Sequence, residues 1–203
     1  VVSGLYIPND GQADPEILTK NISIAAKKKG VKIFEKCKLE KILKRNNQIR
    51  GVKTNLGTIN CEYIVLCAGM WSRQIGEAAG VSIPLYPNEH FYMITEDYKN
   101  LAKNLPTFRD PDTYLYAREY HGKMMLGIFE PKAKNAFKKN GKVPNNFSFG
   151  EFKVDKNYIK MLHQLAAKRI PAIKNLAIKK YFSGPESFTP DSNFLIGETE
   201  EIK

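Results

Sequence analysis

The 203-residue sequence lacks several features that would assign it to a class at once. No run approaches the roughly 18 apolar residues that a membrane-spanning helix requires, and no signal peptide is visible at the N-terminus. Only three cysteines occur, none in CxxC spacing, which argues against a disulfide framework and fits a reducing compartment. We find no GxGxxG dinucleotide fingerprint, no GxSxG nucleophile elbow and no paired-histidine motif, and we predict no metal site.

Basic residues outnumber acidic residues in the sequence. The 32 Lys and Arg residues against 21 Asp and Glu residues give a formal net charge of +11. Most of this charge is lysine, spread along the chain without the arginine and aromatic clusters of a nucleic-acid reader. We therefore interpret it as solvated surface and predict neither nucleic acid nor membrane as a partner. The 42% of hydrophobic residues is enough to form a sizeable core.

The first 82 residues alternate helix and strand in the α/β manner. Asp14 and Pro15 predict the start of a helix, and Gly30 predicts its end. The apolar run at 62–67 predicts a buried parallel strand, with Cys67 as a core residue. The other elements expected here are strands at 31–34, 38–45, 48–54 and 58–61 and a helix at 71–79.

The residue pattern of the sequence changes after an extended linker at 83–87 that contains prolines. Period-two patterns predict strands at 91–95, 114–118 and 124–129, and helical spacing predicts a helix at 155–168. We expect a further strand at 177–182 and a surface excursion at 131–149. Residues 83–187 therefore read as a mainly antiparallel sheet carrying a helix, inserted into the first part.

Two of these strands carry residues suited to chemistry. Alternation places His90, Tyr92 and Ile94 on one face of their strand, and Tyr114, Tyr116 and Arg118 on one face of theirs. If the two strands are neighbours, these side chains converge on a wall typical of small-molecule pockets. An imidazole there can exchange a proton near neutral pH. The alternative, ordinary tyrosine packing on a sheet with a structural histidine, remains open.

A second candidate lies at 65–72, where the predicted buried strand runs through Ala68 and Gly69 into a helix. In α/β folds the carboxyl end of such a strand is where nucleotide cofactors bind. The alternative is an ordinary strand–turn–helix corner, and the spacing alone does not decide between them.

Several segments, in order, resemble one family, the flavin-dependent amine oxidoreductases of the D-amino-acid-oxidase superfamily, and most of all its dimethylglycine and sarcosine dehydrogenases. The most specific are CAGMWS at 67–72 and GPESFTPD at 184–191. The others are GLYIPNDGQADP at 4–15, PLYPNEHFYMITE at 84–96, RDPDTYLYARE at 109–119 and GIFEP at 127–131.

The resemblance implies an α/β plus α+β fold, in which part of an FAD-binding Rossmann-like domain carries an inserted, mainly antiparallel substrate-binding sheet with helices. We expect a partial FAD-binding domain at 1–82, a substrate-binding domain at 83–187 and a return toward the FAD-binding domain at 188–203. The implied cofactor is FAD, and the implied reaction is hydride transfer from an N-methylated glycine, dimethylglycine or sarcosine, to the flavin. The iminium product can hydrolyse or pass its carbon to a folate, which would need domains outside this chain.

The resemblance also implies roles for individual residues. His90 would bind and deprotonate the substrate amine, and Tyr116 would position the substrate, so both are predicted catalytic residues. The predicted substrate-binding residues are Arg118, Tyr92 and Phe188. The predicted cofactor-binding residues are Ala68, Gly69, Trp71, Thr189 and Pro190.

Two other functions stay open at this point. One is a sarcosine or glycine oxidase that passes electrons to oxygen, and the other is a non-catalytic regulatory homologue, although the presence of both His90 and Tyr116 favours an enzyme. The resemblance places such proteins in bacterial cytoplasm or the mitochondrial matrix. Because the dinucleotide fingerprint is missing, we read the chain as a fragment and expect it to bind FAD poorly and to be inactive in isolation.

Overall fold

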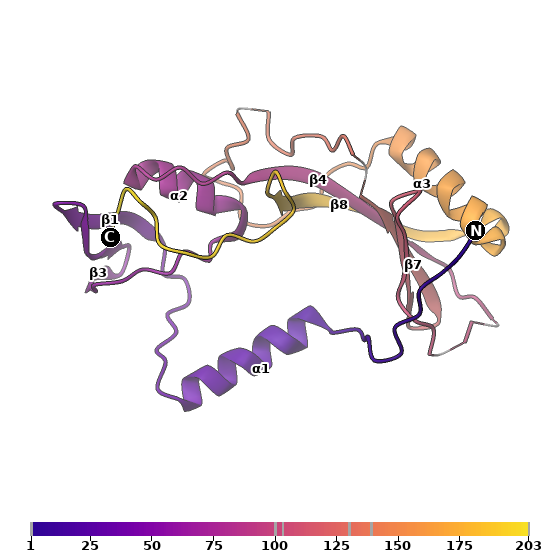
Figure 1. Ribbon diagram of the computed structural model, residues 1–203, viewed down its shortest axis with the longest axis horizontal. Coiled ribbons are helices and arrows are strands. Elements are labelled where there is room, and N and C mark those ends of the chain that lie inside the picture. The colour runs from indigo at the N-terminus through magenta and orange to yellow at the C-terminus, as the bar shows by residue number, and fades with distance from the viewer. Residues whose placement is uncertain (1, 100, 103, 130, 139, 203) are drawn as a thin grey trace. The chain divides into compact units, whose positions relative to one another are not determined.

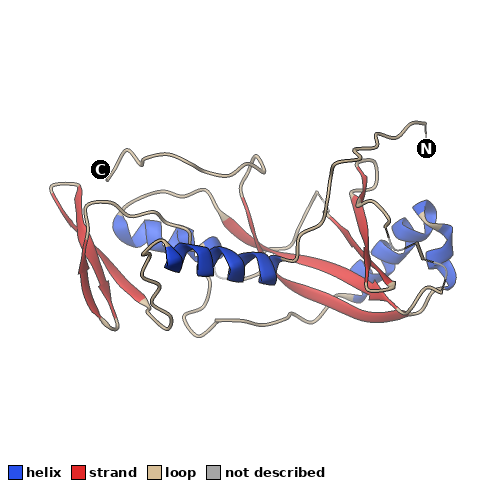
Figure 2. Ribbon diagram, turned by 90° about the horizontal axis from the view of Figure 1, so that it is seen from below, coloured by secondary structure: helices blue, strands red, loops and turns tan. Residues whose placement is uncertain are grey.

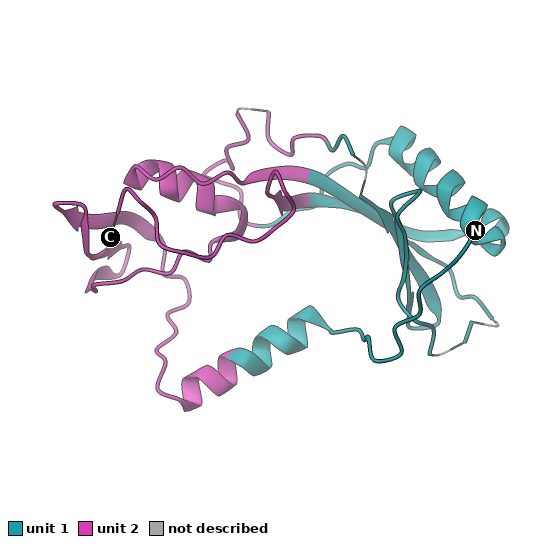
Figure 3. Ribbon diagram, viewed as in Figure 1, with its two compact units in different colours: residues 1–22, 89–133, 149–184 teal, residues 23–88, 134–148, 185–203 magenta. Residues whose placement is uncertain are grey.

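The computed structural model of the chain forms two compact units (Figure 3). Each unit is assembled from three stretches that lie apart in the sequence, and the two are described separately below. Unit 1 comprises residues 1–22, 89–133 and 149–184, and unit 2 comprises residues 23–88, 134–148 and 185–203. The structure describes residues 2–99, 101–102, 104–129, 131–138 and 140–202.

Helices and strands follow the order expected for a mixed α and β chain (Figures 1 and 2). The helices are α1 (Pro15–Lys28), η1 (Gly69–Trp71), α2 (Ser72–Ala79), α3 (Lys156–Arg169) and η2 (Pro171–Asn175). The strands are β1 (Leu39–Arg45), β2 (Gln48–Thr54), β3 (Gly57–Asn60), β4 (Tyr86–Thr95), β5 (Phe108–Asp110), β6 (Leu115–Tyr120), β7 (Lys123–Ile128) and β8 (Ile178–Phe188).

A five-stranded sheet in the order β5-β6-β7-β4-β8 supports unit 1. The pairs β5–β6, β6–β7 and β4–β7 are antiparallel, which confirms the predicted character of this sheet. Alternate residues of β4, β6 and β7 pack with α3 and η2 in a core that includes Phe91, Met93, Leu126, Leu162 and Ile173. Because successive side chains of a strand point to opposite faces, the residues between these core positions lie on the face away from α3.

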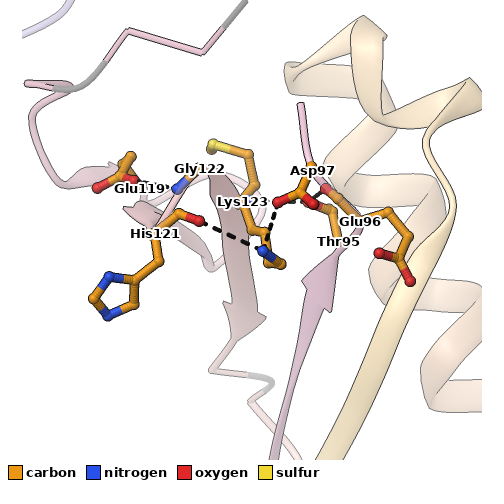
Figure 4. Close-up of polar contacts among 8 residues, drawn as sticks. Thr95, Glu96, Asp97, Glu119, His121, Gly122 and Lys123 are labelled. Carbon is orange, nitrogen blue, oxygen red and sulfur yellow. Dashed lines mark hydrogen bonds and ion pairs between the residues drawn. The ribbon is translucent and has the colours of Figure 1, made fainter. Parts of the chain in front are cut away.

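The β6–β7 hairpin is closed by a tight turn at His121 and Gly122, which have φ angles of 51° and 78° (Figure 4). The Glu119 carboxylate accepts a 2.7 Å hydrogen bond from the Gly122 N–H. Lys123 Nζ lies 2.5 Å from an Asp97 carboxylate oxygen beyond the end of β4. A left-handed pair in a two-residue turn matches the twist of antiparallel strands, so this turn fixes the register of β6 against β7.

The β5–β6 connection is anchored to the end of α3. The Asp110 carboxylate accepts hydrogen bonds from the Thr113 hydroxyl, at 2.5 Å, and from the Arg169 guanidinium. The Thr113 hydrogen bond first, and then Arg169, lower the pKa of the Asp110 carboxyl. These contacts hold the turn from which the chain enters β6.

Unit 2 contains the antiparallel sheet β1-β2-β3 and helix α2. Asn46 and Asn47, with φ angles of 51° and 58°, form the predicted turn between β1 and β2. Lys44 Nζ donates a 2.6 Å hydrogen bond to the Ala79 carbonyl at the end of α2, where a cation complements the helix dipole. A small core of Ile49, Ala79, Val81 and Ile202 closes the unit.

Two predicted strands are wrong. Residues 31–34 and 62–67 form neither helix nor strand, and Tyr63 and Val65 are 79% and 85% exposed. Cys67 is exposed rather than a core residue. A strand requires a hydrogen-bonded neighbour, and neither sheet in the described part of the chain contains one for these residues.

Other differences are smaller. The 131–149 segment is more than a surface excursion, because Phe137 and Val143 are buried. The linker ends early, since β4 already begins at Tyr86, and the last strand continues from 178 to 188 through Pro185. Proline is tolerated there because β8 is an edge strand of its sheet.

Candidate active site

His90 and Tyr116 form the centre of the candidate site on the sheet of unit 1. His90 Nε2 lies 2.9 Å from the Tyr116 hydroxyl oxygen, within hydrogen-bond distance, and the ring centroids are 5.9 Å apart. The two side chains come from β4 and β6, which are not neighbours, because β7 lies between them. The expected meeting of the two residues is therefore confirmed, whereas the assumption of adjacent strands is wrong.

Burial controls the protonation of His90. The ring is half-buried, and the loss of solvent around it lowers its pKa from 6.5 to about 4. His90 is therefore a neutral imidazole at pH 7, whereas a histidine of ordinary pKa would exchange a proton near that pH. A neutral ring has one N–H donor and one nitrogen acceptor, so the His90–Tyr116 pair is a neutral hydrogen-bonding pair.

Phe129 forms an aromatic wall beside this pair. Its ring stacks on His90 at 4.6 Å between centroids and lies 5.2 Å from the Tyr116 ring. The Arg109 guanidinium lies 5.3 Å from the centroid of the same ring. Arg109 is opposite Tyr116 in the β5–β6 register, so it reaches this wall from the next strand. The site thus combines neutral hydrogen-bonding groups, apolar ring surface and a cation.

Tyr92 and Arg118 lie on the same face of the sheet. Tyr92 stacks on Phe182 at 4.8 Å, and burial, the largest cause, raises the pKa of its phenol, so it stays protonated near pH 7. The Arg118 Nη1 group donates a 3.0 Å hydrogen bond to Gln12 Oε1. Both residues extend the polar and aromatic surface away from the His90–Tyr116 pair.

The remaining predicted site residues belong to unit 2. Ala68, Gly69 and Trp71 form the turn and short helix that lead into α2, and Gly69 has a φ of 53°. A Cβ atom on Gly69 would meet no atom of the described residues within 4 Å, so the backbone there is open to close approach. Phe188 ends β8, and Thr189 and Pro190 follow it, with the Thr189 hydroxyl donating to the Asn193 carbonyl at 2.6 Å.

Three residues of the site were missed by sequence reasoning. Gly127 and Phe129 lie two positions apart in the predicted strand at 124–129, and this spacing gave no signal of contact with His90 or Tyr116. Arg109 lies in the three-residue strand β5, which is too short to show a period.

Among the described residues, no cluster of three His, Cys, Asp or Glu side chains is arranged to hold a metal ion. None of the described helices is long and apolar enough to cross a membrane.

Curated relatives match the chain along almost its full length. It is 31% identical over 202 residues to 4-methylaminobutanoate oxidase (formaldehyde-forming) of Paenarthrobacter nicotinovorans, covering 100% of this chain and 24% of the relative. It is 33% identical to mitochondrial sarcosine dehydrogenase of Mus musculus, covering 98% of this chain and 22% of the relative. It is also 32% identical to the mitochondrial pyruvate dehydrogenase phosphatase regulatory subunit of Mus musculus, covering 100% and 23%.

A solved structure and a family model point to the same kind of protein as these relatives. The crystal structure of L-proline dehydrogenase from P. horikoshii aligns with a TM-score of 0.79 at 30% identity, covering 96% of this chain and 49% of the other. The chain spans about a quarter of the length of the curated relatives above. The family model described as FAD dependent oxidoreductase matches residues 1–202. The chain therefore belongs to the DAO family of FAD-dependent oxidoreductases.

Proposed function

We propose that this chain forms the substrate-binding part of an FAD-dependent oxidoreductase that oxidises an N-methylated amino acid, dimethylglycine or sarcosine. The observation that supports this most is the His90–Tyr116 pair, with 2.9 Å between Nε2 and the hydroxyl oxygen. Sarcosine dehydrogenase and 4-methylaminobutanoate oxidase are both named for amines that carry an N-methyl group and a carboxylate. A neutral donor–acceptor pair beside an aromatic wall is suited to the amine end of such a molecule.

The chemistry of this face favours the uncharged form of a bound amine. A protonated amine has no lone pair to support the loss of hydride from the neighbouring carbon. Around His90 and Phe129 a positive charge loses hydration, and such desolvation favours the amine that has released its proton. With a pKa of about 4, His90 does not retain that proton at pH 7, so its proposed role is to hydrogen-bond and orient the amine together with Tyr116.

FAD, when bound, supplies the acceptor for the electrons removed from the amine. Among the described residues, the open backbone at Gly69 fits close contact with such a group, and we propose that Ala68, Trp71, Thr189 and Pro190 also contact it. The sequence has no GxGxxG motif, so these residues fit only part of a dinucleotide site. For the substrate, we propose that Arg118 meets the carboxylate and that Tyr92 contacts the substrate on the same face of the sheet. Phe188 is a further proposed substrate-binding residue, which rests on the family resemblance alone.

Two alternatives follow from the relatives. An oxidase of this family would transfer electrons to oxygen and form peroxide. The similarity to the pyruvate dehydrogenase phosphatase regulatory subunit favours a second alternative, a protein without turnover. The His90–Tyr116 pair favours the enzyme, because a regulatory protein does not need groups that bind and orient an amine.

The test is anaerobic mixing of the full-length protein that contains this chain, purified with FAD, with sarcosine, dimethylglycine or 4-methylaminobutanoate. We expect sarcosine or dimethylglycine to bleach the flavin absorbance within seconds, with glycine as the unmethylated control. Reduction by 4-methylaminobutanoate alone would contradict the proposed substrate. Peroxide formed in air without another acceptor would favour the oxidase. If none of the N-methylated amines reduces the flavin, the proposed function is wrong and the regulatory alternative is preferred.

The compartment is part of the same proposal. The relatives include mitochondrial proteins of Mus musculus and a protein of the bacterium Paenarthrobacter nicotinovorans. We propose the mitochondrial matrix or the bacterial cytoplasm, according to the source of the chain. Fractionation of the source cells, with immunoblotting for the full-length protein, tests this, and recovery with the membrane or the medium contradicts it.

A further inference from the structure

The contact between His90 and Tyr116 crosses a complete strand. In the sheet, Tyr92 of β4 is opposite Gly127 of β7, and Gly127 is in turn opposite Tyr116 of β6. Adjacent strands are about 4.8 Å apart, so the backbones of β4 and β6 are separated by roughly twice that distance. A side chain at position 127 on the face of this pair would stand between the two partners.

Gly127 leaves this space open. A Cβ atom built on Gly127 would lie 2.2 Å from both Cζ and the hydroxyl oxygen of Tyr116 and 2.6 Å from Cε1. The Tyr116 ring therefore lies across the backbone of β7, in the volume that any other residue would occupy. This path brings the phenol to within 2.9 Å of His90 Nε2.

Backbone conformation does not require glycine at this position. Gly127 lies within β7 and is not among the residues with positive φ. Glycine in the interior of a strand weakens the strand, since it loses more conformational freedom on folding and has no side chain to pack. The close approach of Tyr116 therefore explains the glycine, because a side chain at position 127 would occupy the volume of the Tyr116 ring.

Phe129 limits where the Tyr116 ring could go instead. It follows directly after the end of β7, two positions beyond Gly127, and its ring lies 5.2 Å from that of Tyr116 and 4.6 Å from that of His90. To reach 3.4 Å, the lower limit of ordinary contact, the phenol would have to move about 1.2 Å away from an added Cβ. The hydroxyl oxygen is one of the two atoms nearest to the added Cβ, so it cannot keep its present place. If it moved by that amount along the line from His90 Nε2, the 2.9 Å separation would grow beyond hydrogen-bond range.

We infer that Gly127 is a positioning residue of the candidate site: its lack of a side chain lets Tyr116 cross β7 and hydrogen-bond to His90. This inference rests on the proposed function only in its kinetic consequence. The geometric consequence, the separation of His90 Nε2 and the Tyr116 hydroxyl, does not depend on which amine the protein oxidises. The kinetic prediction and the geometric prediction can therefore fail separately.

The test compares Gly127→Ala with Gly184→Ala in the FAD-bound, full-length protein. Gly184 is a suitable control because it is also in a strand and has no positive φ. The nearest atom of the described residues to its added Cβ is the Gly150 carbonyl oxygen, at an ordinary contact distance of 3.9 Å. Misplacement of a substrate-positioning group by about 1 Å costs on the order of 100-fold in rate. We expect Gly127→Ala to slow anaerobic flavin reduction by about this factor and Gly184→Ala to leave it within about 2-fold.

A double-mutant cycle separates positioning from a general loss of stability. In a Tyr116→Ala background the ring is gone, so adding Gly127→Ala should change the remaining rate by less than about 2-fold. An additional large loss in that background would overturn the inference, because Gly127 would then act independently of Tyr116. The crystal structure of Gly127→Ala provides the readout besides activity: we expect more than about 3.5 Å between Nε2 and the hydroxyl oxygen. An unchanged separation overturns the inference, whether or not any N-methylated amine is a substrate.

Discussion

The burial of His90 predicts a loss of stability in acid. Its pKa is about 4 in the folded protein, whereas an exposed histidine has a pKa of 6.5. Between these values the unfolded chain binds a proton at position 90 that the folded chain does not, so the free energy of unfolding falls as the pH falls through this window. The contribution is fully present above pH 6.5.

The size of the effect follows from the same pKa values. At about 1.36 kcal/mol per pH unit, the interval from 6.5 to about 4 corresponds to about 3 kcal/mol. Because the ring is only half-buried, solvent screening reduces this, and we expect about 1–2 kcal/mol between pH 7 and pH 4. A His90→Asn variant has no imidazole and lacks this part of the pH dependence.

Two measurements on the full-length protein check this reasoning. The first is the free energy of urea unfolding from pH 7 to pH 4, for which the difference between wild type and His90→Asn should shrink as the pH falls. The second is an NMR titration of labelled imidazoles, in which the resonance missing from His90→Asn belongs to His90. A titration midpoint near 6.5 for that resonance would refute the argument that burial keeps the ring neutral.

The other predictions concern the hydroxyl of the pair, the core and the anchored turn. Tyr116→Phe removes one hydrogen bond but keeps the ring, so flavin reduction should slow by about 10-fold with little change in Tm; an aggregated variant would instead support a packing role. Leu126→Ala empties a fully buried position of the sheet core, and urea unfolding should show a loss of about 2–5 kcal/mol, whereas a loss below about 1 kcal/mol contradicts this account of the core. Asp110→Asn removes a carboxylate whose pKa is lowered by Thr113 and Arg169, so its Tm should be below that of wild type at pH 7, and acidification through that lowered pKa should close the gap. A gap independent of pH would mean that the charge contributes nothing.

The elements of unit 1 were predictable where their signals are local. The sequence predicted one helix and three strands of this unit to within a few residues: 155–168, 91–95, 114–118 and 124–129. The spacing of apolar residues that marks each of them repeats within the element itself. The same alternation predicted that His90 and Tyr92 share one face. Tyr116 was expected on such a face of its own strand, and the structure brings its hydroxyl to His90.

The way in which His90 and Tyr116 meet was not predictable from local pattern. Strand order is a non-local property, and nothing in the sequence of β4 or β6 indicates that β7 lies between them. Gly127 gave no signal either, since a glycine in a strand pattern is compatible with a bulge, a weak strand or a close approach. Only the register, in which Gly127 faces both Tyr92 and Tyr116, identifies it as the point where the phenol crosses.

The two failed strand predictions, at 31–34 and 62–67, have the same physical origin. An apolar run indicates that a segment favours burial, but the surface that buries it is not encoded in the run itself. The His90–Tyr116 pair differs, because its two side chains come from β4 and β6 of one sheet, and both residues lie in unit 1. The proposed contacts of Ala68 and Gly69 depend on a cofactor. A failure of flavin binding would therefore count against the role of residues 68–71, while the geometry around Gly127 would still predict a neutral His90 hydrogen-bonded to Tyr116.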